Sequence, residues 1–192
     1  MPNPLSRIPG SWGHIELGEV GTGTLSSRPA LALAAMECIA TWSHVENFMF
    51  DFYADLAGGV KTDAAAIYFA LTGAAPKREV VATLAKRKLD PSRLELFGAL
   101  TRLTKAGQKE RDRLAHWIWG TASGLPDALL LADPRDEAHS SETILVYTQR
   151  DFDTIRRQFE RLAKLYFNFR FVARAMDQSQ EIFDALSAEL AP

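Results

Sequence analysis

Asp112 and His116 form the pair of residues best suited to acid–base chemistry in this chain. The two lie four positions apart, so on a helix their side chains are neighbours. A carboxylate in that place favours the imidazolium and selects the tautomer of the ring, which suits a general acid or base near neutral pH. A histidine in the last turn of a helix can instead interact with the helix dipole alone, and this structural interpretation stays open.

Arg111 stands directly before this pair, and its guanidinium is always charged. On a regular helix it shares a face with mostly apolar or small residues, namely Leu100, Thr104, Gly107, Leu114 and Ile118. A charge directed toward such a face needs a partner or a cleft. The structural alternative is an ion pair with a buried acid such as Glu46. Because an ideal helix separates Arg111 from His116 by about 140°, a joint site requires the helix to unwind or the arginine side chain to bend round.

Residues 111–116, with the sequence RDRLAH, resemble the R-x4-6-H signature of HEPN domains. The Leu-Ala pair before the histidine and Trp117 after it also look like many members of that family. An early helix that carries Trp42, Ser43 and Glu46 is similar to the family's first long helix. In helix order, the resemblance covers residues 27–176, whereas its specific part is about eight residues long.

The HEPN resemblance implies a dimeric helical bundle that cleaves RNA without a metal or another cofactor, in a cleft lined by paired motifs. In such a reaction the RNA's own 2′-hydroxyl is the nucleophile and His116 moves protons to or from it. Arg111 would hold the phosphate, and Asp112 would orient His116. Further candidates for binding are Lys109, Arg113 and Glu46.

The same resemblance suggests a biological setting, because HEPN proteins often belong to toxin–antitoxin or antiviral defence systems. The partners it implies are RNA, a second copy of the chain, and an antitoxin or nucleotidyltransferase. Other members have lost catalysis, so the alternative is a non-catalytic RNA- or protein-binding or oligomerisation module. A third interpretation is a helical scaffold unrelated to HEPN, in which the motif is accidental.

Apolar residues at three- and four-residue spacing predict helices over most of the chain. Caps and breakers set their expected bounds, which are 29–56, 63–71, 76–89, 91–117, 149–176 and 179–190. Two short apolar runs, 127–133 and 142–147, favour a small β-hairpin with a long tip. We therefore predict an all-α fold, an antiparallel HEPN-like bundle with at most this minor hairpin at about 127–147.

Residues 1–26 lack clear periodicity, and we expect an irregular arm with a short extended piece at His14–Val20. Residues 27–192 are predicted to form a single helical-bundle domain, because no linker divides them. The helix at 149–176 carries aromatic residues that point in several directions. A helix that is apolar on more than one face is either central or pairs with another subunit, so we expect a homodimer.

The composition narrows the location and the chemistry. The lone cysteine, Cys38, excludes an internal disulfide and favours a cytoplasmic location. We expect neither a secretory signal nor a membrane span, because the N-terminus has no apolar core and no apolar run reaches eighteen residues. No histidine pair has helical metal-ligand spacing, so we expect no metal site.

The net charge is −2, yet residues 77–113 hold eleven Lys/Arg against five Asp/Glu. That segment is either a face that binds polyanions or a set of ordinary solvated helix faces.

Overall fold

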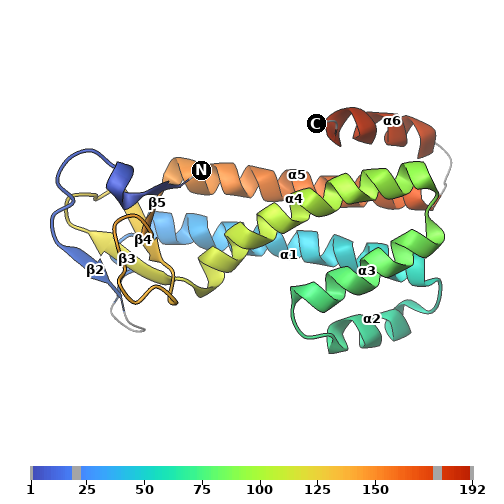
Figure 1. Cartoon of the computed structure of the whole chain (residues 1–192), viewed down its shortest axis with the longest axis horizontal. Coiled ribbons are helices and arrows are strands. Elements are labelled where there is room, and N and C mark those ends of the chain that lie inside the picture. Colours follow the sequence, from blue (N-terminus) through green and yellow to red (C-terminus); the bar gives the residue numbers. More distant parts are fainter. Residues whose placement is uncertain (1, 19–22, 175–178, 191–192) are drawn as a thin grey trace. The chain divides into compact units, whose positions relative to one another are not determined.

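The computed structural model describes residues 2–18, 23–174 and 179–190 (Figure 1). They form six α-helices, a short 3-10 helix (Leu5–Arg7) and a five-stranded antiparallel sheet. The chain divides into two compact units. Unit 1 consists of Met1–Trp42 and Ala106–Phe159, and unit 2 of Ser43–Lys105 and Glu160–Pro192. Three helices contribute residues to both units, and they are α1 (Pro29–Ala57), α4 (Pro91–His116) and α5 (Gln149–Ala173).

The sheet of unit 1 has the strand order β1-β5-β4-β3-β2. Its strands are short: β1 (Asn3–Pro4), β2 (Ile15–Leu17), β3 (Ile118–Ala122), β4 (Ala128–Ala132) and β5 (Leu145–Thr148). β3 follows α4 directly, and the N-terminal segment supplies both edge strands. Ile15 pairs with Ala122, and Asn3 pairs with Val146. Segments more than one hundred residues apart in the sequence therefore complete one sheet.

The central strand β4 is buried on both faces, since all five of its residues are shielded from solvent. One face joins an apolar cluster that includes Leu130 and Val146 and is covered by the N-terminal Leu5, Ile8 and Trp12. The opposite side of the strands carries Leu129, Leu131 and Tyr147, each 0% exposed. The Tyr147 ring stacks on that of Phe152 on α5, with 5.6 Å between the ring centres. A strand covered on both faces is a continuous apolar run, and this explains the sequence Ala-Leu-Leu-Leu-Ala.

The prediction of an all-α fold is wrong, because the chain combines helices with a five-stranded antiparallel sheet. The two runs predicted as a hairpin are present as β4 and β5, and Leu130 pairs with Val146. They are, however, the interior of a larger sheet rather than a minor addition to a bundle. Strands of two to five residues show too few alternations to stand out in a sequence, and only pairing with remote partners stabilises them.

The predicted extended piece at His14–Val20 contains β2, while residues 19–22 lie outside the described residues.

The helices lie within a few residues of their expected bounds. Besides α1, α4 and α5, they are α2 (Lys61–Ala70), α3 (Ala74–Lys88) and α6 (Ser179–Leu190). Local signals explain these ends. Gly58 follows α1 with a positive φ of 66°, and the Arg93 backbone N–H donates to Asp90 at 3.0 Å where α4 begins. None of the helices in the described ranges is long and apolar enough to cross a membrane.

Unit 2 has an aromatic core that its helices share. The ring of Phe52 lies 5.4 Å from that of Phe97 and 5.2 Å from that of Phe169. Thr104 and Tyr166 meet by a buried hydroxyl contact of 2.9 Å. The buried phenol therefore keeps a polar partner inside an otherwise apolar interior.

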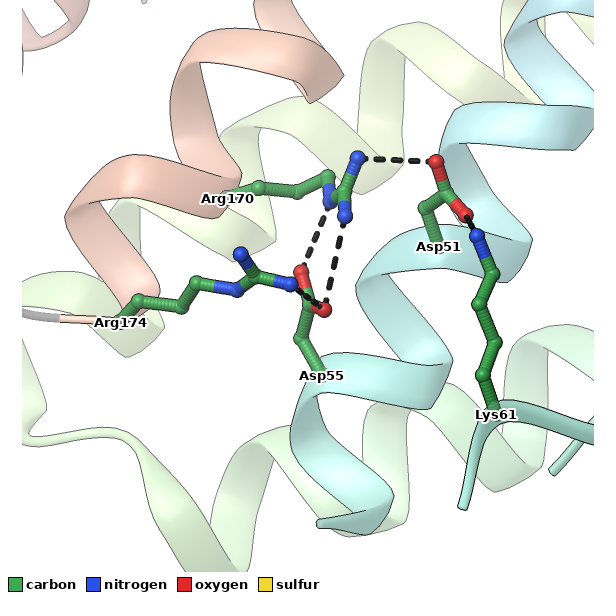
Figure 2. A network of polar contacts seen from close by, with 5 residues as sticks. All are labelled: Asp51, Asp55, Lys61, Arg170 and Arg174. Carbon is green, nitrogen blue, oxygen red and sulfur yellow. Dashed lines mark hydrogen bonds and ion pairs between the residues drawn. The ribbon is translucent and has the colours of Figure 1, made fainter. Parts of the chain in front are cut away.

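A network of charged side chains links α1, α2 and the C-terminal end of α5 within unit 2 (Figure 2). Arg170 on α5 donates to Asp55 at 2.7 Å and to Asp51 at 2.8 Å, both on α1. Arg174 pairs with Asp55 as well, and Lys61 lies 2.7 Å from Asp51. Asp51, Asp55 and Arg170 are all mostly buried. One guanidinium thus holds two carboxylates that would repel each other without it.

We expect Gly120→Ala to destabilise unit 1. A Cβ at Gly120 would lie 2.7 Å from the backbone oxygen of Glu16 and 3.3 Å from Leu17 Cα, so β2 and β3 would have to separate. Overpacking of this kind costs about 1–3 kcal/mol of unfolding free energy. Gly98→Ala on α4 is the matched control, because its Cβ meets only Arg102 Nη1 at 3.9 Å. It should be neutral or stabilising by up to about 1 kcal/mol. Urea unfolding of both variants checks this, and equal effects would contradict the close β2–β3 packing.

We also expect Arg170→Ala to lower the unfolding free energy by about 1.5–3 kcal/mol, since it leaves mostly buried carboxylates without their hydrogen bonds. The control is Arg161→Ala, which breaks the 2.8 Å ion pair with Glu189 between half-exposed side chains. An exposed pair of this kind contributes about 0–1 kcal/mol. Thermal and urea unfolding compare the two arginines. Similar losses would mean that the network in Figure 2 carries no special stability.

Candidate active site at the end of helix α4

The last turn of α4 has a buried side and an exposed side. Leu114 and Glu110 point inward, with exposed fractions of 1% and 5%, whereas Ala115 and His116 are exposed. The backbone N–H of Trp117 still donates to the Arg113 carbonyl at 3.0 Å before the chain enters β3. The helix is therefore regular through His116, and the adjoining strand holds the position of its end.

Arg111 and His116 come together on this turn. Nη1 of Arg111 lies 3.5 Å from Nε2 of His116 and 3.2 Å from Oδ1 of Asp112. The helix does not unwind, so the long arginine side chain spans the 140° that separates the two positions. Gln108 Nε2 donates to the same Asp112 oxygen at 2.7 Å. Three of the predicted site residues thus form one contiguous polar cluster with Gln108.

The donor and acceptor roles in this cluster follow from the groups themselves. A guanidinium can only donate, so a hydrogen bond from Arg111 to His116 Nε2 requires the tautomer with the ring proton on Nδ1. Nε2 of that tautomer is the atom that could act as a proton acceptor. Asp112 contacts Arg111 and Gln108, and its influence on His116 passes through the guanidinium.

The Arg111 side chain is 26% exposed, but its atoms differ in environment. Nε is buried and has no hydrogen-bond partner, while Nη1 reaches the surface beside His116. Leaving a buried donor unpaired costs free energy, typically about 1–3 kcal/mol. Nε of Arg113 is also buried without a hydrogen-bond partner, so the position of Nη1 beside His116 is what distinguishes Arg111.

Beside the exposed cluster lies a second one, formed by the buried Glu110 and Tyr147 and the partly buried Arg113 and Trp117. Arg113 Nη1 donates to Glu110 Oε1 at 2.5 Å, and the Tyr147 hydroxyl donates to Oε2 at 3.3 Å. The Arg113 guanidinium lies over the Trp117 ring at 5.3 Å. Burial raises the pKa of Tyr147 well above its usual range, and the negative charge of Glu110 raises it further. Tyr147 therefore stays a phenol and a donor.

The remaining predicted binding residues are dispersed. Arg113 belongs to the second cluster, and Lys109 is exposed on α4. Glu46 is exposed on the part of α1 that belongs to unit 2. There, burial and, to a lesser extent, the Glu46 carboxylate raise the pKa of Tyr68 to about 12. The partners that the structure gives Arg111 are Asp112 and His116, both on α4.

Cys38 does not take part in this site. Its side chain is fully buried, and its thiol donates to the Phe152 carbonyl at 3.3 Å. Burial raises the pKa of the thiol to about 12, so the reactive thiolate is disfavoured at neutral pH. In the described part of the chain, no group of three or more His, Cys, Asp or Glu residues is placed to hold a metal ion.

Sequence reasoning missed Gln108, Glu110 and Tyr147. Gln108 stands four residues before Asp112, a spacing at which a glutamine and an aspartate can hydrogen-bond on a helix. That signal was present and could have been used. Glu110 gave no comparable sign, because its burial depends on β5 coming to lie against α4.

We predict opposite effects of two carboxylate substitutions on this turn. Glu110→Ala should lower the unfolding free energy by about 3–5 kcal/mol, since it leaves the mostly buried Arg113 charge without its partner. Asp112 has a side chain that is 48% exposed. Asp112→Ala should therefore change stability by less than about 1 kcal/mol. Urea unfolding of both variants provides the comparison, and an Asp112 variant as unstable as the Glu110 variant would contradict this division of roles.

Comparisons with family models, with curated proteins and with solved structures give no match to this chain. The resemblance to HEPN domains therefore depends on the residues at 111–117 and the helix order alone.

Proposed function

We propose that this protein is a metal-independent endoribonuclease that uses the exposed cluster at the end of α4. The observation that carries the proposal is the 3.5 Å approach of Arg111 Nη1 to His116 Nε2. It places a fixed positive charge and a proton acceptor side by side in one chain. A phosphodiester needs both, because a hydroxyl must lose its proton while negative charge builds on the phosphate.

In the proposed reaction, the 2′-hydroxyl of a ribose attacks the adjacent phosphorus and gives its proton to Nε2 of His116. The bond from phosphorus to the 5′-oxygen breaks, and that oxygen takes a proton from water. The products are a 2′,3′-cyclic phosphate and a 5′-hydroxyl. Arg111 exchanges its contact with His116 Nε2, and part of its contact with Asp112, for the phosphate oxygens. This frees the Nε2 lone pair for the proton, and the guanidinium charge offsets the charge that develops on the phosphate. His116 then returns its proton to solvent.

The second candidate function is an RNA-binding module without cleavage. The 3.2 Å contact between Arg111 and Asp112 favours it, since a guanidinium already paired with a carboxylate offers less charge to a reacting phosphate. The antitoxin or nucleotidyltransferase partner implied by the HEPN resemblance is compatible with both functions. The homodimer expected from the sequence stays a prediction, and the Arg111–His116 pair forms without a second copy.

We expect His116→Ala to reduce RNA cleavage by about 10²–10⁴, because it removes the proton acceptor. Arg111→Ala should reduce it by about 10²–10³ through loss of the phosphate charge. The assay is cleavage of labelled single-stranded RNA and tRNA in EDTA, with the cyclic phosphate ends identified by mass spectrometry. A substrate carrying 2′-O-methyl groups should resist cleavage. His44→Ala, which removes an exposed histidine of α1, is the matched control.

Three results of this assay bear directly on the proposal. Cleavage that requires a divalent metal, or that persists in the His116→Ala variant, would overturn the mechanism. Binding of RNA by the wild-type protein without any cleavage would favour the second candidate. Thermal melts run in parallel show whether each variant retains its fold, so that a loss of activity can be assigned to the site.

A further inference from the structure

A second group of side chains with the chemistry of nucleic-acid recognition lies in unit 2. Phe69 of α2 is 59% exposed, although large aromatic side chains are usually covered. The centre of its ring lies 5.0 Å from that of Phe50 on α1 and 5.5 Å from that of Tyr68. Phe69 thus presents part of a rigid ring to solvent, supported from behind by two other aromatic residues.

Two lysine side chains lie close to these rings. Lys77, at the start of α3, places its ammonium 5.2 Å from the centre of the Tyr68 ring and 5.4 Å from that of Phe69. Lys61 lies 5.7 Å from the centre of the Phe50 ring while it pairs with Asp51. We call Phe50, Tyr68, Phe69, Lys61 and Lys77 the α2–α3 aromatic–lysine cluster. It combines an exposed ring with the charge of Lys77, since Lys61 is paired with Asp51. All five residues belong to unit 2.

The charge of α3 extends this positive character. The helix holds five basic residues against one acidic residue, Glu79, and its last three residues are Lys86, Arg87 and Lys88, all exposed. Lys88 is eleven positions after Lys77, so a regular helix brings it back to within about 20° of the same direction. The side of α3 between these two lysines carries Leu84 and the buried Val81, so the positive charge lies near the two ends of the helix.

From these observations we infer that the α2–α3 aromatic–lysine cluster binds single-stranded RNA. A base stacks on the open part of the Phe69 ring, and its phosphate meets the Lys77 ammonium. Proteins that bind single strands combine aromatic platforms with basic grooves in this way. A partner that bound only through apolar contact would not account for Lys77 beside the rings or for the excess of basic residues on α3. The inference extends the proposed function by adding a binding surface for its substrate, but its test does not require cleavage.

The test is binding of full-length protein to a fluorescein-labelled 2′-O-methyl oligouridine, followed by fluorescence anisotropy. This probe lacks the 2′-hydroxyl nucleophile, so binding is measured whether or not the protein is a nuclease. Phe69→Ala should weaken binding about tenfold, and Phe69→Tyr should retain it because the ring remains. Lys77→Gln should weaken binding and reduce the slope of log affinity against log salt by about 0.7, the value for one lost phosphate contact.

Two controls separate base stacking from general apolar contact. Ile67→Ala removes an equally exposed aliphatic residue of α2, at 58%, and Phe167→Ala removes an exposed aromatic of α5, at 43%. Both variants should bind the probe like the wild type. Equal losses in the Ile67→Ala and Phe69→Ala variants would overturn the inference. It would also be overturned if the wild type bound an acidic peptide but not the oligonucleotide, or if the two α2 substitutions changed self-association instead.

The two proposals fail in different ways. Tight binding of the probe that depends on Phe69, combined with no cleavage of natural RNA, would refute the nuclease and keep the binding surface. Cleavage that depends on His116, with binding indifferent to Phe69 and Lys77, would keep the nuclease and refute the surface. A wild type that does not bind the probe at any accessible salt concentration would refute the inference directly.

Discussion

A buried carboxylate, Glu110, links the end of α4 to the sheet of unit 1. Both of its oxygens are occupied, one by Arg113 on the same helix and the other by the hydroxyl of Tyr147 on β5. A buried charge is tolerated only when its partners are in place, so this arrangement allows little freedom to the last turn of the helix. The exposed face of that turn carries Arg111 and His116. The candidate site is therefore held from behind by contacts that take no part in the proposed chemistry.

Arginine serves different purposes in the two units, and burial decides which. Arg170 is mostly buried and joins Asp51 and Asp55 on another helix, an arrangement that holds the structure together. Arg111 pairs with its neighbour Asp112, whose side chain is half exposed, and one of its nitrogens is left buried without a partner. The first arrangement joins two helices, whereas the second places a guanidinium nitrogen beside an exposed histidine. The approach of Arg111 Nη1 to His116 Nε2 at the exposed end of α4 is the physical reason for the proposed site.

The proposed functions of the two units use different parts of RNA. At the end of α4, a guanidinium and an imidazole act on the phosphate and on the ribose hydroxyl, which every nucleotide has. The α2–α3 aromatic–lysine cluster offers a ring for a base and ammonium groups for the phosphates around it. Stacking tolerates many base sequences, because each base has a flat face. The two proposed sites together would recognise RNA by its single-stranded character rather than by a defined sequence.

The sequence by itself determined the helices, because their apolar spacing, caps and glycine stops act over a few residues, as at Asp90 and Gly58. It also singled out Arg111, Asp112 and His116, whose mutual approach depends on one helix and on the reach of one side chain. The sheet was decided by tertiary structure, since β2 pairs with β3 across about one hundred residues. Neither strand is long enough to show a recognisable alternation of apolar and polar residues in the sequence. Glu110 and Tyr147 were missed for the same reason. Burial and hydrogen bonding between remote segments arise only when the chain has folded, and no local pattern encodes them.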